Sequence, residues 1–162
     1  MKNIAIIHFN RPVDKVVKVM GNQIRRDGNR VTYINPSVIW EEDGEEINSS
    51  CSKSQILTQF DAFIIVADED SCNFGYDELY WLSSLIIANR DTKKFAVFTF
   101  TKNLKELPDI CSALKSLIHD CANYEEPVFA LCSLGKTKRN HIKSYLLLKQ
   151  MNVFLRNLYN KL

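Results

Sequence analysis

Hydrophobic residues along this chain form two alternating patterns, short continuous runs and longer stretches with helical spacing. A continuous apolar run predicts a strand that is covered on both faces of a sheet. The runs predict strands over residues 4–9, 30–34, 60–67, 94–100 and 128–132. Apolar residues that recur every three or four positions predict helices between and after these strands. The predicted helices cover residues 12–26, 50–59, 76–89, 107–118 and 138–162.

The alternation of strands and helices predicts the fold class. A strand followed by a helix, repeated about five times, is typical of an α/β protein whose parallel strands are joined by right-handed crossovers. We therefore expect a flavodoxin-like three-layer sandwich with a five-stranded parallel sheet in the order 2-1-3-4-5. The length of 162 residues, without internal repeat, low-complexity tract or linker, predicts a single α/β domain over 1–162.

Two helices have features of their own. Gly28 is expected to end the first helix. The last helix carries more apolar residues than one narrow stripe accommodates.

The composition of the chain limits the classes of molecule that it is expected to bind. The formal net charge of +2 gives no reason to expect nucleic-acid binding, and the basic cluster 136–143 fits a solvated helix start better than a polyanion site. No apolar run approaches the roughly 20 residues of a membrane helix, and the first run ends at His8 without a cleavage-like sequence. Five cysteines without CxxC spacing predict free thiols and no metal site. We expect a cytoplasmic protein that binds neither nucleic acid nor membrane.

Candidate chemistry gathers where two loops should meet. Strands one and three are neighbours in the predicted order, so the loops at their carboxyl ends flank one crevice at the topological switch point. Arg11, with the amides that open the first helix, would bind a phosphate there. Glu78, at the start of the helix after strand three, is the candidate catalytic residue, acting on a sugar bond. The candidate substrate-binding residues are His8, Phe9, Asn10, Arg11, Trp40, Phe74, Gly75, Tyr76 and Trp81.

Each candidate also has a structural interpretation. A glutamate at a helix start is favoured by the helix dipole alone, and Phe74 and Trp81 fit a core at least as well as a stacking platform. The acidic turn 68–70 suits solvent better than a hard cation. The chain has five glycines and contains neither GxGxxG, nor a Walker A loop, nor a GxSxG elbow. Classical dinucleotide binding, P-loop phosphate binding and serine hydrolysis are therefore unsupported.

The octet Cys72–Leu79 resembles a motif of Toll/interleukin-1 receptor (TIR) domains. The family pattern S-x-W-C-x-x-E-L is matched directly by Glu78 and Leu79, while Cys, Phe and Gly replace its Ser, Trp and Cys. Arg11 and Asp14 stand where the family often places Arg and Asp, and residues 40–47 resemble its BB loop. The similarity covers roughly residues 3–132.

This resemblance implies an activity. Catalytic TIR domains cleave the nicotinamide–ribose bond of NAD, to ADP-ribose or a cyclised product, and depend on the motif's glutamate, here Glu78. The resemblance implies NAD as substrate, no prosthetic group, a role in signalling or defence, and a possible homo-oligomer. Other TIR domains are non-enzymatic assembly modules, which is the alternative within the same family.

Two further resemblances keep other functions open. Nucleoside 2-deoxyribosyltransferases are similar in placing a nucleophilic glutamate after a glycine at such a turn, although the spacing from Gly75 to Glu78 is one short. The start Ile6–Pro12 is similar to that of NADPH-dependent FMN reductases, which implies FMN as cofactor. Their P-E-Y-N turn is replaced here by Asp68–Ser71, whose acids would repel a flavin phosphate.

Overall fold

The computed structural model describes residues 1–8, 14–34, 60–68, 76–89, 94–101, 116, 119, 128–133 and 140–162. All five predicted strands are present, with ends that differ from the predictions by at most two residues. They are β1 (Asn3–His8), β2 (Arg30–Ile34), β3 (Ala62–Asp68), β4 (Lys94–Thr101) and β5 (Val128–Ser133). The predicted helix over 50–59 lies outside the described residues, as does most of that over 107–118, of which Ser116 and His119 are described and helical.

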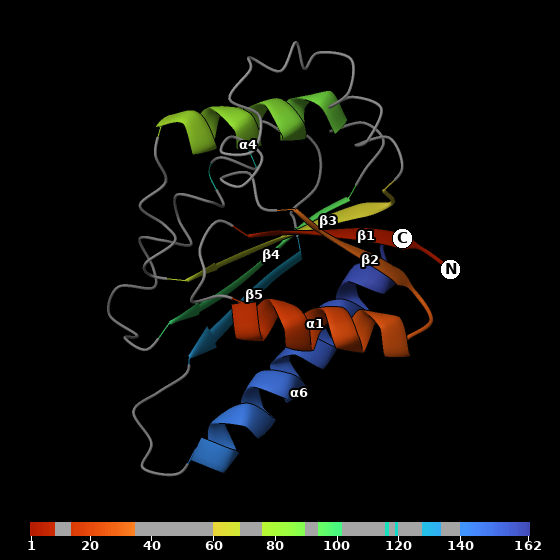
Figure 1. The fold of residues 1–162 in the computed structure, drawn as a ribbon, viewed down its shortest axis with the longest axis vertical. Coiled ribbons are helices and arrows are strands. Elements are labelled where there is room, and N and C mark those ends of the chain that lie inside the picture. The colour runs from red at the N-terminus through yellow and green to blue at the C-terminus, as the bar shows by residue number, and fades with distance from the viewer. Residues whose placement is uncertain are drawn as a thin grey trace.

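The strands form one parallel sheet in the order β2-β1-β3-β4-β5, which confirms the predicted topology (Figure 1). β1 lies inside the sheet, between β2 and β3. Its last residue, His8, is in register with Val66 of β3, so β3 continues two residues further at the carboxyl edge. Both strands therefore end at the same edge, as the argument for a shared site requires.

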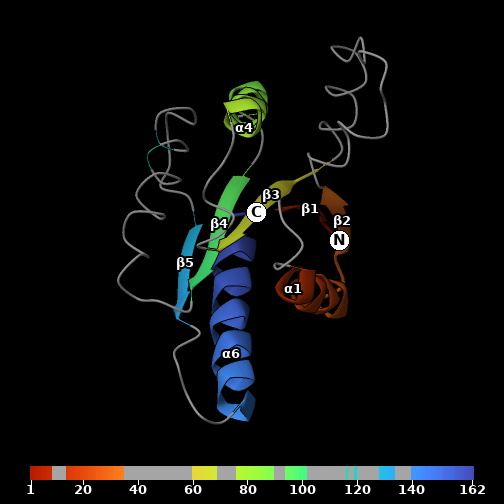
Figure 2. The same cartoon turned by 60° about the vertical axis from the view of Figure 1, so that its left-hand side comes forward.

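Helices cover both faces of the sheet. Helices α1 (Asp14–Arg26) and α6 (Asn140–Tyr159) pack on one face and α4 (Tyr76–Asn89) on the other (Figures 1 and 2). Alternate residues of β1 enter the two resulting cores: Ile4 and Ile6 pack with α1 and α6, whereas Ala5 and Ile7 pack with α4. This double coverage is why the strands are continuously apolar. None of the helices within the described ranges combines the length and apolarity needed to cross a bilayer.

Aromatic rings fill both cores. On the α4 side, Phe63 and Phe95 stack with ring centroids 5.2 Å apart. On the opposite side, Phe98 of β4 meets Phe154 of α6 edge to face, also at 5.2 Å. Such pairs add about 0.5–1.5 kcal/mol each beyond their buried area. The first pair packs β3 against β4, and the second packs β4 against α6.

Gly28 ends α1, as predicted. Its φ of 80° lies in the left-handed region that favours glycine. Its amide donates to the carbonyl of Arg25 at 3.0 Å, and the Asn29 amide donates to that of Ile24 at 3.1 Å. This pair of bonds is a Schellman motif, which reverses the chain directly into β2.

Polar contacts join the chain ends at the amino edge of the sheet. The Lys2 amide donates to Asn29 Oδ1 at 2.9 Å, and Lys2 Nζ donates to the Leu162 carbonyl at 3.1 Å. The Tyr159 hydroxyl donates to Asp27 Oδ2 at 3.0 Å. Burial, reinforced by this bond to the Asp27 carboxylate, raises the pKa of Tyr159 well above its ordinary value. These contacts give the amino edge a structural role.

Candidate functional site

The carboxyl edge between β1 and β3 is the topological switch point of the sheet. From β1 the chain crosses through α1 to β2, whereas from β3 it crosses through α4, on the opposite face, to β4. The two connections leave the sheet in opposite directions, and ligands of open α/β sheets bind at such points. The strand order confirms the premise of the site prediction, that β1 and β3 are neighbours whose carboxyl ends share one edge.

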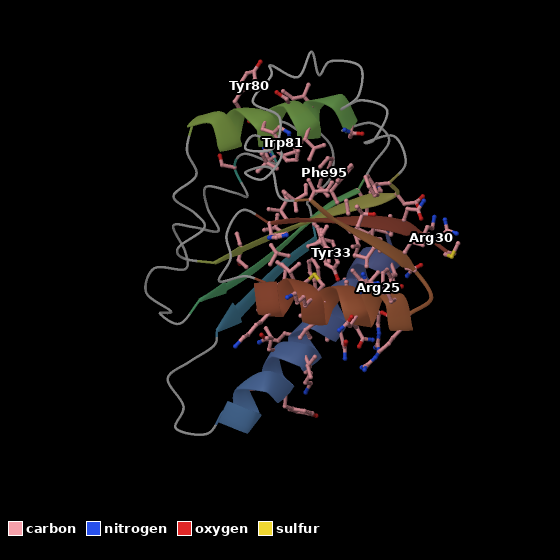
Figure 3. All side chains as sticks on the ribbon, viewed as in Figure 1. Arg25, Arg30, Tyr33, Tyr80, Trp81 and Phe95 are labelled. Atoms are coloured by element: carbon pink, nitrogen blue, oxygen red, sulfur yellow. The ribbon has the colours of Figure 1, made fainter. Side chains whose placement is uncertain are left out.

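Seven residues separate the end of β3 at Asp68 from the start of helix α4 at Tyr76. The inner face of α4 is defined by buried Trp81 and Leu82, and its outer face by exposed Tyr80. Trp81 is 9% exposed and lies between the helix and the sheet, while Tyr80 is 66% exposed and points away (Figure 3). Further along the helix, Leu85, Ile86 and Asn89 are also buried, whereas Ser84 and Ile87 are exposed.

Position 78 belongs to the inner line of α4. It precedes Leu82 by four residues and Leu85 by seven, and residues at these intervals share one face of a helix. The rest of that line is apolar or amide-bearing, so a carboxylate interrupts it in the first turn. The amides of this turn carry the positive end of the helix dipole, which favours a negative charge there. The sequence thus places a glutamate in the first turn of α4, on the line of positions that Leu82 and Leu85 continue.

The predicted site residues are described to different extents. His8 is the last residue of β1; it is partly exposed, and its Nδ1 atom is buried. Trp81 is packed in the core beneath α4, as its structural interpretation predicts. Tyr76 and Glu78 lie in the first turn of α4, and their side chains are outside the described part of the structure. The candidates that lie wholly outside the described residues are Phe9, Asn10, Arg11, Trp40, Phe74 and Gly75.

Two further polar positions share this edge and were missed by sequence reasoning. Thr101 ends β4 and Ser133 ends β5, and the two residues are in register. A hydroxyl residue closing an apolar strand is a weak signal by itself. This signal becomes informative only when the strand order is known, because that order places these two strand ends beside the end of β3, where Asp68 is in register with Phe100. Among the described residues, no group of three or more His, Cys, Asp or Glu is arranged to hold a metal ion.

Solved structures share this architecture at low sequence identity. Flavodoxin 1 from Bacillus cereus superposes with a TM-score of 0.55 and 16% identity, over 95% of this chain and 97% of that one. The general stress protein 14 from Treponema denticola, solved in complex with FMN, gives 0.55 and 9%, over 99% of each chain. The chain has a flavodoxin-like fold.

The same fold occurs in proteins of other kinds. The RPS4 and RRS1 TIR domain heterodimer matches with a TM-score of 0.53 and 13% identity, over 98% of this chain and 97% of that one. The flavodiiron core from Synechocystis sp. PCC6803 matches at 0.62 and 16%, over 99% of this chain, which spans 37% of that longer one. Neither a protein-family model nor a curated protein matches the sequence. At these identities the likeness establishes the fold alone.

Proposed function

We propose that this protein binds NAD at the carboxyl edge between β1 and β3 and cleaves its nicotinamide–ribose bond with the help of Glu78. The observation that carries the proposal is the position of residue 78, in the first turn of α4 and four and seven residues before the buried Leu82 and Leu85. A glutamate on an otherwise apolar line costs free energy unless a partner, a ligand or solvent compensates its charge, and we infer that a bound ligand is what it serves. The topological switch point supplies the place for a ligand.

The chemistry suits an ionised carboxylate. Breaking the bond between the ribose C1′ and the pyridine nitrogen sends the bonding electrons to nicotinamide, which leaves as a neutral base. Positive charge then develops on the ribose, as in glycoside hydrolysis. A carboxylate held beneath the ring would stabilise that charge. Water adds to C1′ and releases one proton, giving ADP-ribose, so no strong general acid is required.

The charges along the carboxyl edge favour one orientation of NAD. The pyrophosphate would lie toward β1 and the start of α1, where Arg11 follows the strand in the sequence. The cationic nicotinamide ring would lie toward β3, whose last residue is Asp68 and which is followed by Glu69 and Asp70. The basic residue at one end of the site and the acidic residues at the other would fix the orientation of the bound NAD.

The test is turnover of NAD by concentrated protein, with nicotinamide and ADP-ribose quantified by chromatography. Glu78→Gln keeps the size of the side chain but removes the charge, and it should lower the rate at least about 100-fold, a typical loss for one electrostatic group. Asp77→Asn is the matched control: it makes the same charge change one position earlier and should leave most of the rate. Circular dichroism confirms that both variants fold.

The proposal fails if wild-type protein at high concentration releases no nicotinamide. It also fails if Glu78→Gln and Asp77→Asn have equal rates, because the reaction would then not depend on residue 78. Transfer of the ribosyl group to an added base, in place of hydrolysis, would keep the role of Glu78 and change the acceptor.

FMN binding is the second candidate, favoured by the FMN complex of the similarly folded Treponema denticola protein. The residues of this chain fit FMN less well than NAD on charge. β3 ends in Asp68, and the flavin ring has no positive charge to offset the acids that follow. Purified protein with absorbance near about 450 nm, the colour of the bound cofactor itself, would favour FMN; colourless protein that takes up no added FMN would exclude it.

A further inference from the structure

The first half of α6 projects beyond the sheet and beyond α1 (Figures 1 and 2). From Met151 onward the helix is anchored, because Met151, Phe154, Leu155 and Leu158 are buried in the core. Among residues 145–150, whose side chains the structure describes, Leu147 alone packs partly against the core. The helix nevertheless stays apolar on its solvent side, where Tyr145, Leu146, Leu148 and Val153 are between 39 and 66% exposed. Clustered apolar exposure of this kind marks interaction surfaces.

The charge of this part of the chain has one sign. Residues 127–162 contain no Asp or Glu, although the chain has 19 such residues, all of which precede residue 127. The same stretch contains Lys136, Lys138, Arg139, Lys143, Lys149, Arg156 and Lys161. Of these, Lys149 and Arg156 are exposed on the described part of α6. A one-signed surface attracts a partner of opposite charge and repels a second copy of itself.

The cations lie within the apolar surface and do not border it. Tyr145, Lys149 and Val153 follow one another at intervals of four residues, and such residues form one line along a helix. Arg156 follows Val153 by three residues and Lys149 by seven, so it continues the same line. Leu146 and Leu148 flank that line on either side. The exposed face therefore alternates apolar and cationic side chains along its axis.

We propose that this outer face of α6 docks an acidic amphipathic helix of a partner protein. The inference is independent of the NAD chemistry. A membrane-surface helix separates its cations from its apolar face, whereas here Lys149 and Arg156 are at the centre of that face. A second α6 would bring cations against cations. A partner helix with leucines and glutamates at heptad spacing would pack on Leu146 and Val153 while its carboxylates pair with Lys149 and Arg156.

The test measures binding of a designed probe. A fluorescent amphipathic peptide of about three heptads, with leucine at the core positions and glutamate beside them, is titrated with the full-length protein and followed by anisotropy. We expect binding that weakens at least about 10-fold in the double variant Lys149→Glu, Arg156→Glu. A peptide with lysine in place of glutamate should bind the double variant more tightly than it binds wild type. Lys15→Glu with Lys18→Glu, which reverses two exposed charges on α1, is the matched control and should bind like wild type.

Because Lys149 and Arg156 are exposed, the reversed variant should fold, and a thermal melt checks this. Leu146→Ser provides a second variant that removes apolar contact without changing charge, and it should also weaken binding. The proposal is overturned if the glutamate peptide binds wild type and the charge-reversed variant equally. It is also overturned if wild type binds phosphatidylserine vesicles but not the peptide, or if α6 mediates self-association that the charge reversal abolishes in sedimentation.

Discussion

Gly21 of α1 provides a test of how the helix packs on the edge strand. A Cβ atom built on Gly21 would contact the Tyr33 hydroxyl and would lie 2.8 Å from Cζ and 3.0 Å from Cε1 of the same ring. Real Cβ atoms do not approach other atoms this closely, so Gly21→Ala must displace the whole ring. The Arg25 guanidinium lies 5.5 Å from the centroid of that ring, and both residues are labelled beside α1 in Figure 3.

Two effects of Gly21→Ala oppose each other. Alanine stabilises a helix interior by about 0.8–1.0 kcal/mol relative to glycine. Tyr33 is 37% exposed, so displacing its ring gives up about two-thirds of the burial of an aromatic side chain, or about 1–2 kcal/mol. Loss of the cation–π contact removes about 0.5–1 kcal/mol more. The net expectation is a destabilisation of about 0.5–2 kcal/mol.

A double-mutant cycle isolates the contact. Urea unfolding followed by circular dichroism gives the free energy of unfolding for wild type, Gly21→Ala, Tyr33→Ala and the double variant. In the Tyr33→Ala background the ring is absent, so Gly21→Ala should stabilise by about 1 kcal/mol. The substitution therefore changes sign between the two backgrounds. Equal effects in both backgrounds would refute the packing argument.

Two further stability predictions follow from the amino edge of the sheet. Gly28→Ala should lower the free energy of unfolding by about 1–2 kcal/mol, because φ is 80° with open space around the position, and Gly28→Asn should lower it less; denaturant titration of both variants measures this. Tyr159→Phe should cost about 1 kcal/mol at pH 7 by removing the bond to Asp27, and this difference from wild type should shrink as the pH rises above about 10. The raised pKa of Tyr159 keeps the folded hydroxyl protonated while the unfolded one ionises, so its contribution is complete below the unfolded pKa and declines above it. A difference that stayed constant to pH 11 would contradict this assignment.

The fold was largely predictable because the spacing of apolar residues along the chain indicates which positions are buried. β1 and β3 are covered on both faces, so every side chain in their centres is apolar and the runs are unmistakable. Gly28 was predictable because few residues tolerate its backbone conformation. The strand predicted to begin at Phe60 begins at Ala62 instead. Phe60 is buried like a strand residue, but Asp61 uses its carboxylate to accept the Asn3 amide, and the ladder starts after it.

The candidate site and the surface of α6 were less predictable, for different reasons. The spacing of apolar residues carries no information about segments 9–13 and 69–75, which lie outside the described residues. Position 78 could be placed because it lies inside a helix. In α6, Leu146 and Leu147 are equally apolar, yet only Leu147 packs against the core. Adjacent helix residues point in directions about 100° apart, and the sequence does not reveal which of these directions faces the sheet.

The bond between Lys2 Nζ and the Leu162 carbonyl brings the two ends of the chain together at the amino edge, where Figure 1 marks them side by side. A purification tag or a surface-immobilisation handle at either end would therefore sit opposite the β1–β3 carboxyl edge and leave it accessible. A short peptide bridge between the ends should yield a circularly permuted protein, in which breaks introduced near the carboxyl edge would alter the candidate site without disturbing the core.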